Sequence, residues 1–287
     1  MHYPRLLVAS AVLAVTAASQ INAADSWKPL FNGKDFSNWN MFLAIPDPSV
    51  DVPGLKRDAN GKYLEPIGLN RDPLKVFNFR TVDGGPVIYV TGEGFGTITT
   101  KESYGNFHVR LQMKWGEKKW APKLNAPRDC GLLYFCHGPL GVEHGQWPRS
   151  VEFQIQEHDI GDLYALMTRV TVNARHEGRL WLYDPKGQPA LFQQKPPVSN
   201  RCVKLGDPEK PNGEWNTLDL YCFGDYSMHV VNGSVVMRLH NVERIDGPAP
   251  APISSGQISL QTEGAEVYYR NVEITPITGM PAEYAEE

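Results

Sequence analysis

Polar and apolar residues alternate with a period of two along much of this chain, which is the pattern of strands with one buried and one open face. The alternation is clearest over residues 150–158. Its apolar positions are Val151, Phe153 and Ile155, and its polar positions are Glu152, Gln154, Gln156 and His158. Neighbours on one face of a strand lie about 6–7 Å apart. We expect the polar positions to form either a solvated outer face or the floor of a substrate groove.

Further strands are predicted by the same alternation and by apolar runs between turn signals. They cover residues 87–90, 96–100, 107–115, 131–136, 169–173, 179–183, 217–223, 227–231, 234–239, 256–262 and 266–274. The hairpin around Asn232-Gly233 is the clearest, because Asn-Gly fits a type I′ turn. Helical periodicity is almost missing. Many strands without helices between them predict an all-β fold, an antiparallel β-sandwich.

The N-terminal segment has a different pattern. Arg5 precedes an apolar run over residues 6–18, and residues 21–23 end in a small residue, Ala23. This predicts a secretory signal peptide over residues 1–23, since the run is too short to span a membrane. We therefore expect an exported protein, periplasmic or extracellular and without a membrane anchor. Residues 24–287 are expected to form a single domain.

Composition narrows the range of partners. The formal net charge is −4, and neither a Lys/Arg cluster nor aromatic-basic interleaving is present, which argues against nucleic acid. Aromatic residues make up 10% of the chain, and their rings could stack on sugars. Trp115, Trp181 and Trp215 are nevertheless expected in the core. For Cys202 and Cys222, a disulfide bond and buried free thiols are both open.

Several motifs resemble a known family when they are read in order. They are residues 30–39 (LFNGKDFSNW), 107–115, 129–134 (DCGLLY), 152–156 (EFQIQ), 213–216, 231–233, 256–261 and 269–274. Together they resemble the successive motifs of the 3-keto-disaccharide hydrolase family, over nearly all of residues 24–287. The resemblance implies a concanavalin A-like jelly roll with a carbohydrate groove on its concave sheet. It also implies a small-molecule or oligosaccharide substrate.

The implied chemistry is elimination from a 3-keto sugar, whose C2 proton is acidified by the neighbouring carbonyl. The reaction needs a base, donors for the enolate oxygen and an acid for the leaving group. We expect Glu152 or His158 as the base. The expected substrate-binding residues are Gln154, Gln156, Arg149, Trp147, Asp129, Tyr134 and His137. Among these, Trp147 could stack on the sugar and Arg149 could instead pair with Glu152.

Two other functions stay open. Glu152 and Glu157 could form the carboxylate pair of a laminarinase-like retaining glycoside hydrolase, if a bulge turned Glu157 to the face of Glu152. The protein could also be a non-catalytic carbohydrate-binding module. No cofactor is predicted. A divalent metal on His137, His144, His158 and Glu152 is conceivable, but no fixed ligand spacing supports such a site.

Overall fold

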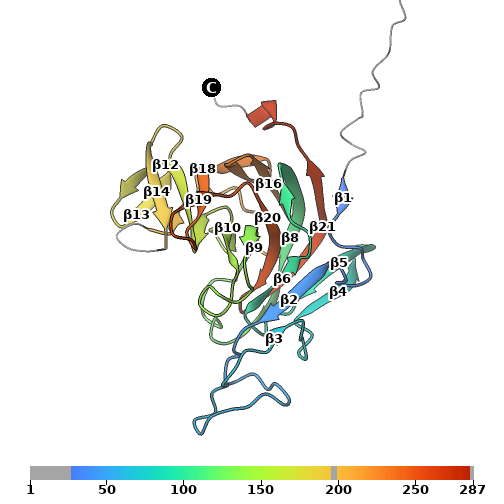
Figure 1. The fold of residues 1–287 in the computed structure, drawn as a ribbon. Coiled ribbons are helices and arrows are strands. Elements are labelled where there is room, and N and C mark those ends of the chain that lie inside the picture. The colour runs from blue at the N-terminus through green and yellow to red at the C-terminus, as the bar shows by residue number, and fades with distance from the viewer. Residues whose placement is uncertain (1–26, 195–198, 285–287) are drawn as a thin grey trace, which may run out of the picture.

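The computed structural model describes residues 27–194 and 199–284, and the predicted signal peptide lies outside these ranges. The described chain forms two large antiparallel sheets, of twelve and nine strands, packed face to face (Figure 1). A short 3₁₀ helix at Ala282–Tyr284 is the one helical element in this part of the chain. The predicted antiparallel sandwich is confirmed. No helix within the described ranges is long and apolar enough to cross a membrane.

The twelve-stranded sheet contains most of the C-terminal strands. Its order is β13 (Leu180–Tyr183), β12 (Thr168–Glu177), β18 (Ser234–Arg244), β17 (Tyr226–Val231), β16 (Asn216–Phe223), β8 (Phe107–Lys119), β21 (Ala265–Pro276), β5 (Gly85–Val90) and β4 (Phe77–Val82). Three strands pair outside this path, namely β1 (Lys28–Pro29) with β21, β14 (Gln188–Gln193) with β12 and β19 (Ala251–Pro252) with β18.

The nine-stranded sheet carries the segment that the sequence singled out. Its order is β15 (Arg201–Cys202), β11 (Leu163–Leu166), β10 (Arg149–Gln156), β9 (Asp129–His137), β20 (Ser255–Thr262), β6 (Gly96–Thr100), β2 (Trp39–Leu43) and β3 (Gly68–Leu69), with β7 (Tyr104–Gly105) attached to β20. Strands β10, β9 and β20 therefore lie side by side, although β20 is more than a hundred residues further along the chain.

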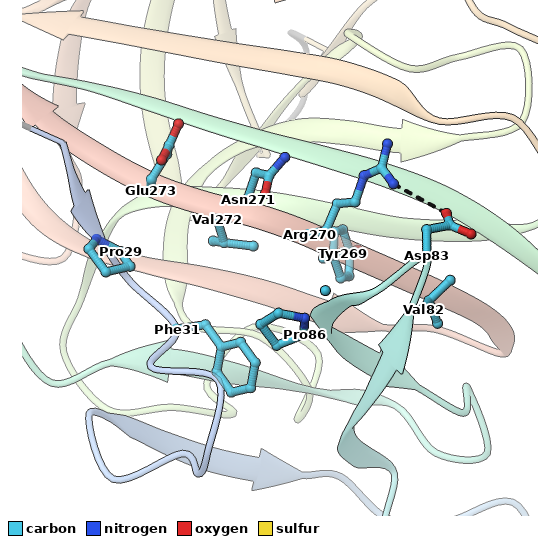
Figure 2. Close-up of a pocket in the computed structure, with 11 residues that line it drawn as sticks. Pro29, Phe31, Val82, Asp83, Pro86, Tyr269, Arg270, Asn271, Val272 and Glu273 are labelled. Carbon is cyan, nitrogen blue, oxygen red and sulfur yellow. Dashed lines mark hydrogen bonds and ion pairs between the residues drawn. The ribbon is translucent and has the colours of Figure 1, made fainter. Parts of the chain in front are cut away.

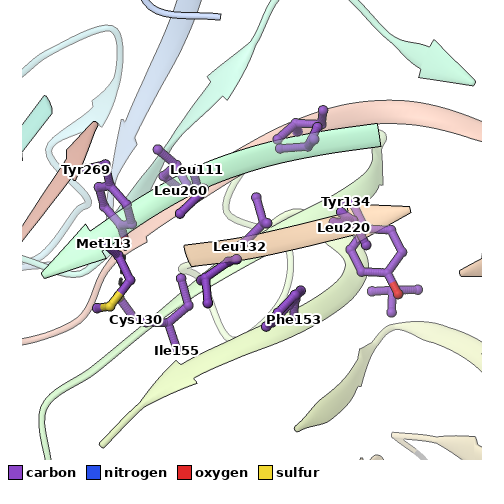
Figure 3. Close-up of a cluster of buried hydrophobic side chains, with 14 of the residues drawn as sticks. Leu111, Met113, Cys130, Leu132, Tyr134, Phe153, Ile155, Leu220, Leu260 and Tyr269 are labelled. Atoms are coloured by element: carbon purple, nitrogen blue, oxygen red, sulfur yellow. Dashed lines mark hydrogen bonds between the residues drawn. The ribbon is translucent and has the colours of Figure 1, made fainter. Parts of the chain in front are cut away.

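The inner faces of the two sheets form one large hydrophobic core (Figure 3). Phe153 and Ile155 of β10 lie in it, together with Leu220 of β16 and Leu111 of β8. All four side chains are fully buried. Because burial of one such side chain contributes about 1.5–3 kcal/mol, this core fixes which face of β10 points inward. The polar positions of β10 must then point to the outer face.

The predicted hairpin is confirmed in detail. Asn232 and Gly233 connect β17 to β18, and both have positive φ, 49° and 82°, as a type I′ turn requires. Strands β2, β4, β11 and β14 were missed by the sequence reading. β4 is largely exposed and β14 carries Gln and Pro, so neither shows a clear apolar alternation.

The four cysteines are free and buried. Cys202 lies in the nine-stranded sheet and Cys222 in the twelve-stranded sheet, where the Cys222 thiol donates to Ser227 Oγ at 3.5 Å. The disulfide alternative is therefore wrong, and the alternative of buried thiols is confirmed. The two thiols are kept apart by the positions of their strands, which the spacing of the cysteines along the chain does not reveal.

Candidate functional site

The polar side chains of β10 lie on the outer face of the nine-stranded sheet, opposite the core. Glu152 is paired with Leu133 of β9, Gln154 with Gly131, and Gln156 with Asp129. The register from Val151 to Gln156 is regular, because the bulge between these strands lies before Val151. The predicted common face of the three polar residues is thus formed.

This face is covered at its centre. Glu152 is 5% exposed and Gln154 is 6% exposed, so the open groove floor expected from the sequence is wrong for these two residues. Leu133 packs with Trp147 in a second hydrophobic cluster on the outer face, to which Phe95 and Tyr164 belong. Trp147 comes from the segment before β10, Tyr164 from β11 and Phe95 from the loop before β6.

Trp147 contributes to this cover rather than standing open to a sugar. Its ring is buried and lies parallel to Phe95, with 6.2 Å between the ring centroids. The predicted role of Trp147 as an exposed stacking platform is therefore wrong in this conformation. Trp147 packs here because Leu133, on the sheet face below it, is apolar. The sequence predicted a β9 strand buried on both sides, and such a pattern does not show which face Leu133 occupies.

A glycine brings Glu152 and Gln261 of β20 together across β9. A Cβ atom at Gly131 would lie 2.3 Å from Glu152 Oε1 and 2.6 Å from Gln261 Oε1. Only the absence of a side chain at this position leaves room for both groups. The amide of Gln261 is 1% exposed and lies beside the carboxyl of Glu152, whose charged form it stabilises.

A half-buried cation, Lys123, joins two further carboxylates beside this pair. Lys123 Nζ donates to Asp129 Oδ2 and, at 2.5 Å, to Glu263 Oε1. Asp129 Oδ2 also accepts from Gln156 Nε2 at 2.8 Å, and Asp129 Oδ1 has no partner among the described residues. Lys123 and Glu263 retain 23% and 17% side-chain exposure, so the cluster reaches the surface through them. Lys123, Asp129, Glu152, Gln156, Gln261 and Glu263 are called the acidic cluster below.

Sequence reasoning missed Lys123 and Glu263. Lys123 lies in the polar loop between β8 and β9, and Glu263 lies in the turn between β20 and β21. Neither segment carries a periodic pattern, and the loop is fixed on the turn by Trp120 N–H, which donates to Gly264 O at 2.8 Å. No signal in the sequence brings two such loops together, because their contact depends on the strand order.

The carboxyls of the cluster differ in protonation. Burial raises the pKa of Glu152 well above its usual range, and the charges of Glu263 and Asp129 raise it further while Lys123 opposes them. Burial and the charge of Asp129 raise the pKa of Glu263 to about 7, against the opposing effect of Lys123. These pKa directions favour the protonated form of Glu152, and they place the ionisation of Glu263 near neutral pH. Two carboxyls held in different protonation states are typical of an acid and a base.

His158 does not belong to this cluster. Its side chain is 87% exposed in the turn after β10, and its Nδ1 lies 3.7 Å from Asp207 Oδ2. At about 3.3 Å per residue, Gln156 is already about 13 Å from Glu152 along the strand, and His158 lies beyond it. The prediction that His158 could serve as the base beside Glu152 is wrong on this geometry.

Tyr134 is also misplaced in the sequence reading. It is fully buried in the sandwich core, where its hydroxyl donates to His229 Nε2 at 3.0 Å. His229 Nδ1 in turn donates to Gly161 O, and burial lowers the pKa of His229 to about 4, so the imidazole stays neutral. Tyr134 cannot contact a substrate on the outer face. A near-continuous apolar strand such as β9 gives no alternation from which its inward side could be read.

His137 of β9 and Arg149 of β10 lie opposite each other in the strand register, at the start of β10 and away from Gln156. His137 Nδ1 lies 3.0 Å from Phe135 O, while its buried Nε2 has no partner among the described residues. Arg149 Nε lies 4.0 Å from Asp246 Oδ2, so the alternative that Arg149 pairs with Glu152 is wrong. The structure does not bring these two residues to the acidic cluster.

Glu157 is held outside the Glu152 face. Its carboxylate accepts from Arg128 N–H at 2.6 Å, from the Arg128 guanidinium at 2.5 Å and from Asn212 at 2.5 Å. No bulge interrupts β10 between Glu152 and its end, so the retaining pair of Glu152 and Glu157 is not formed. Within the described ranges, no group of three or more His, Cys, Asp or Glu side chains is arranged to hold a metal ion.

An antiparallel sandwich with carboxyls, amides and aromatic rings gathered on one sheet face is typical of carbohydrate-active domains. The comparison with family models is specific: the model of the 3-keto-alpha-glucoside-1,2-lyase-like domain matches residues 26–275. The chain therefore belongs to this family, as the motifs of its sequence indicated. It is a carbohydrate-active, glycosyl hydrolase-like domain.

Several solved structures resemble the chain in fold. A candidate glycosyl hydrolase of Parabacteroides distasonis is 20% identical, with 91% of this chain and 98% of that chain covered and a TM-score of 0.48. The β-glucanase of Bacillus licheniformis is 9% identical, with 88% and 97% covered and a TM-score of 0.42. The carbohydrate-binding module CBM66 of Bacillus subtilis is 10% identical, with 69% and 91% covered and a TM-score of 0.40. No curated protein sequence matches the chain significantly.

Proposed function

We propose that this protein cleaves 3-keto-glycosides by elimination across C1 and C2 of the oxidised sugar. The arrangement that supports the proposal is the ion pair of Glu263 with Lys123, close to Glu152, a second carboxyl whose pKa burial raises well above its usual range. Elimination needs these three functions, namely an acid, a base and a charge that stabilises an enolate. The family of the chain supports the same chemistry.

In the proposed reaction, the ionised carboxylate of Glu263 takes the proton from C2. The C–H electron pair moves toward the C3 carbonyl and forms an enolate, whose negative oxygen is stabilised by the Lys123 ammonium. The enolate then collapses: the C3 carbonyl re-forms, a double bond forms between C1 and C2, and the bond from C1 to the glycosidic oxygen breaks. Glu152 donates its proton to that oxygen. Water added later to C1 gives net hydrolysis.

The assignment reverses the role that the sequence suggested for Glu152. A carboxyl that is 5% exposed and close to two other carboxyls holds its proton at neutral pH, so it serves as an acid more readily than as a base. Glu263 is better placed as the base because it reaches solvent and titrates near neutrality. Gln156, which is half-buried and donates to Asp129, is assigned to a sugar hydroxyl.

The test is turnover of 3-keto disaccharides and of the same disaccharides unoxidised, followed by enone absorbance and released sugar. We expect turnover of the 3-keto substrates alone, and a loss of about 10²–10⁴-fold in kcat for Glu263→Gln and Glu152→Gln. Asp219→Asn is the matched control, since Asp219 is a buried carboxylate on the outer face of the other sheet. Turnover of only the unoxidised disaccharides would contradict the proposal.

The 5% exposure of Glu152 favours a second candidate, a carbohydrate-binding module without catalysis. Glu152→Ala separates the two functions. Loss of turnover with retained sugar binding supports an enzyme, whereas wild-type protein that binds the 3-keto disaccharide without converting it supports a binding module.

A further inference from the structure

A hollow lies along the edge of β21 in the twelve-stranded sheet, whereas the acidic cluster lies on the nine-stranded sheet (Figure 2). It has a volume of about 330 Å³. It exists because β21 lacks a strand partner over a short stretch of one edge: β5 pairs with it up to Tyr269, and β1 pairs from Glu273 onward. The hollow occupies the gap between these two short strands.

A β-bulge shapes the floor of this gap. The pairing of β21 with β8 shifts between Arg270 and Glu273, and Asn271 within the shift has a positive φ of 52°. A bulge of this kind re-aims neighbouring side chains. Arg270, Asn271 and Glu273, which a regular strand would alternate between two faces, consequently all line the hollow.

The walls of the hollow divide into an apolar and a polar side. Figure 2 shows Phe31 and Pro86 on one side and the side chains of Arg270 and Asn271 on the other, with Asp83 at the end next to Arg270. Such a division matches a sugar ring, which has apolar C–H faces and a rim of hydroxyls. A volume near 300 Å³ is at the lower end for ligand pockets, which suits one or two sugar units.

The polar side is held in place by its neighbours. Arg270 Nε donates to Gln112 Oε1 at 2.7 Å, and its Nη1 donates to Asp83 Oδ2 at 3.3 Å. The guanidinium lies 4.0 Å from the ring centroid of Trp215, whose Nε1 donates to the same Asp83 oxygen at 3.2 Å. The prediction that Trp215 belongs to the core is wrong, since it lies on this outer surface as a support for Arg270.

The apolar side is equally fixed, and the family's opening motif builds it. Leu30 N–H donates to Val272 O at 2.9 Å, and Trp39 Nε1 donates to Leu30 O at 3.0 Å. Both bonds hold the backbone of Leu30, the residue just before Phe31, whose ring stacks on Phe36 with 5.5 Å between centroids. A rigid ring loses little conformational entropy when a ligand binds to it.

We propose that this hollow is a second carbohydrate-binding site, which takes an uncharged sugar unit and performs no chemistry. Two carboxylates and one guanidinium surround it, of which Asp83 and Arg270 are paired, so it carries no cationic excess that would select a phosphate or a carboxylate. The carboxylate of Glu273 and the amide of Asn271 would accept and donate hydrogen bonds at sugar hydroxyls. The proposal is independent of the elimination reaction, because the two sites are built on different sheets.

Trp215 supplies a readout that belongs to this site alone. Its indole N–H contacts Asp83 and its ring contacts Arg270, so sugar bound in the hollow should shift its signal in a ¹H–¹⁵N correlation spectrum. Trp147, which covers the other site, serves as the internal comparison. The two signals are assigned with Trp215→Phe and Trp147→Phe. The probes are unoxidised maltose, cellobiose and trehalose at millimolar concentrations.

We expect at least one probe to shift the Trp215 signal in a saturable manner. The double variant Arg270→Gln, Glu273→Gln should bind that probe at least tenfold more weakly. Glu273→Gln alone, nearly isosteric and remote from the Trp215 contacts, should weaken binding several-fold and guards against misfolding of the double variant. Glu177→Gln with Arg179→Gln is the charge-matched control, since both residues are exposed in the β12–β13 hairpin. A shift of the Trp147 signal alone, no shift with any probe, or equal binding by the variants would overturn the proposal.

Discussion

Gly131→Ala tests the arrangement of the acidic cluster with a single methyl group. The added Cβ would lie 2.3 Å from Glu152 Oε1 and 2.6 Å from Gln261 Oε1, so both groups must move by about 1 Å to reach ordinary contact distance. Gly131 has no positive φ, and Ala fits its backbone conformation. A displacement of this size at reacting groups costs about a hundredfold in rate. Overpacking costs about 1–3 kcal/mol of stability.

The assay compares kcat and KM for a 3-keto disaccharide with the free energy of unfolding in urea. We expect kcat to fall by about a hundredfold while most of the protein stays folded. Gly116→Ala is the matched control: its Cβ would lie 2.2 Å from Glu266 Oε2, so it pushes a carboxylate on the other sheet in the same way. If Gly131→Ala kept kcat within about twofold of Gly116→Ala, the position of Glu152 would not matter to the reaction.

Four further predictions concern charge and redox state. The kcat/KM of the wild type should rise with pH through about 7 as Glu263 ionises, and Glu263→Gln should lack this limb in a pH–rate profile. Because folding raises the pKa of Glu263 from 4.5 to about 7, its contribution to stability is full below pH 4.5 and is lost as pH rises to about 7, by up to about 3 kcal/mol. Urea unfolding of Glu263→Gln should show a flatter pH dependence, and an unchanged slope would contradict it. Lys123→Met should move the rise of kcat/KM to higher pH, since Lys123 lowers the pKa of Glu263. If the rise stayed at the same pH, the ion pair with Lys123 would not determine the pKa of Glu263. A thiol reductant should leave Tm unchanged because all four cysteines are free, whereas a lower Tm would reveal a disulfide.

The fold could be predicted from the sequence because strands and tight turns leave patterns in neighbouring residues. Alternation placed Phe153 and Ile155 in the core, and Asn232-Gly233 specified the β17–β18 hairpin through its turn geometry. The motifs also gave the family. Strands with weak alternation, such as β4 and β14, were missed because exposed edge strands bury little apolar surface and carry no such pattern.

The site could be predicted only in part, because its members meet through topology. The face that carries Glu152 followed from the period of β10, but its cover by Trp147 and Phe95 did not, since loops have no periodicity from which their path can be read. Lys123 and Glu263 lie in two such loops and come together only because β9 and β20 are neighbours. Their joint effect on proton affinity therefore could not be foreseen.

Removal of the C2 proton by the acidic cluster is the central claim, and isotopic substitution at that carbon tests it most directly. The measurement compares kcat/KM for a 3-keto disaccharide carrying hydrogen or deuterium at C2 of the oxidised ring, for wild type and Glu263→Gln. We expect slower turnover of the deuterated substrate by the wild type, with enone formation, and near-complete loss of turnover and enone in the variant. Equal rates for the two isotopologues, together with full activity of Glu263→Gln, would contradict it.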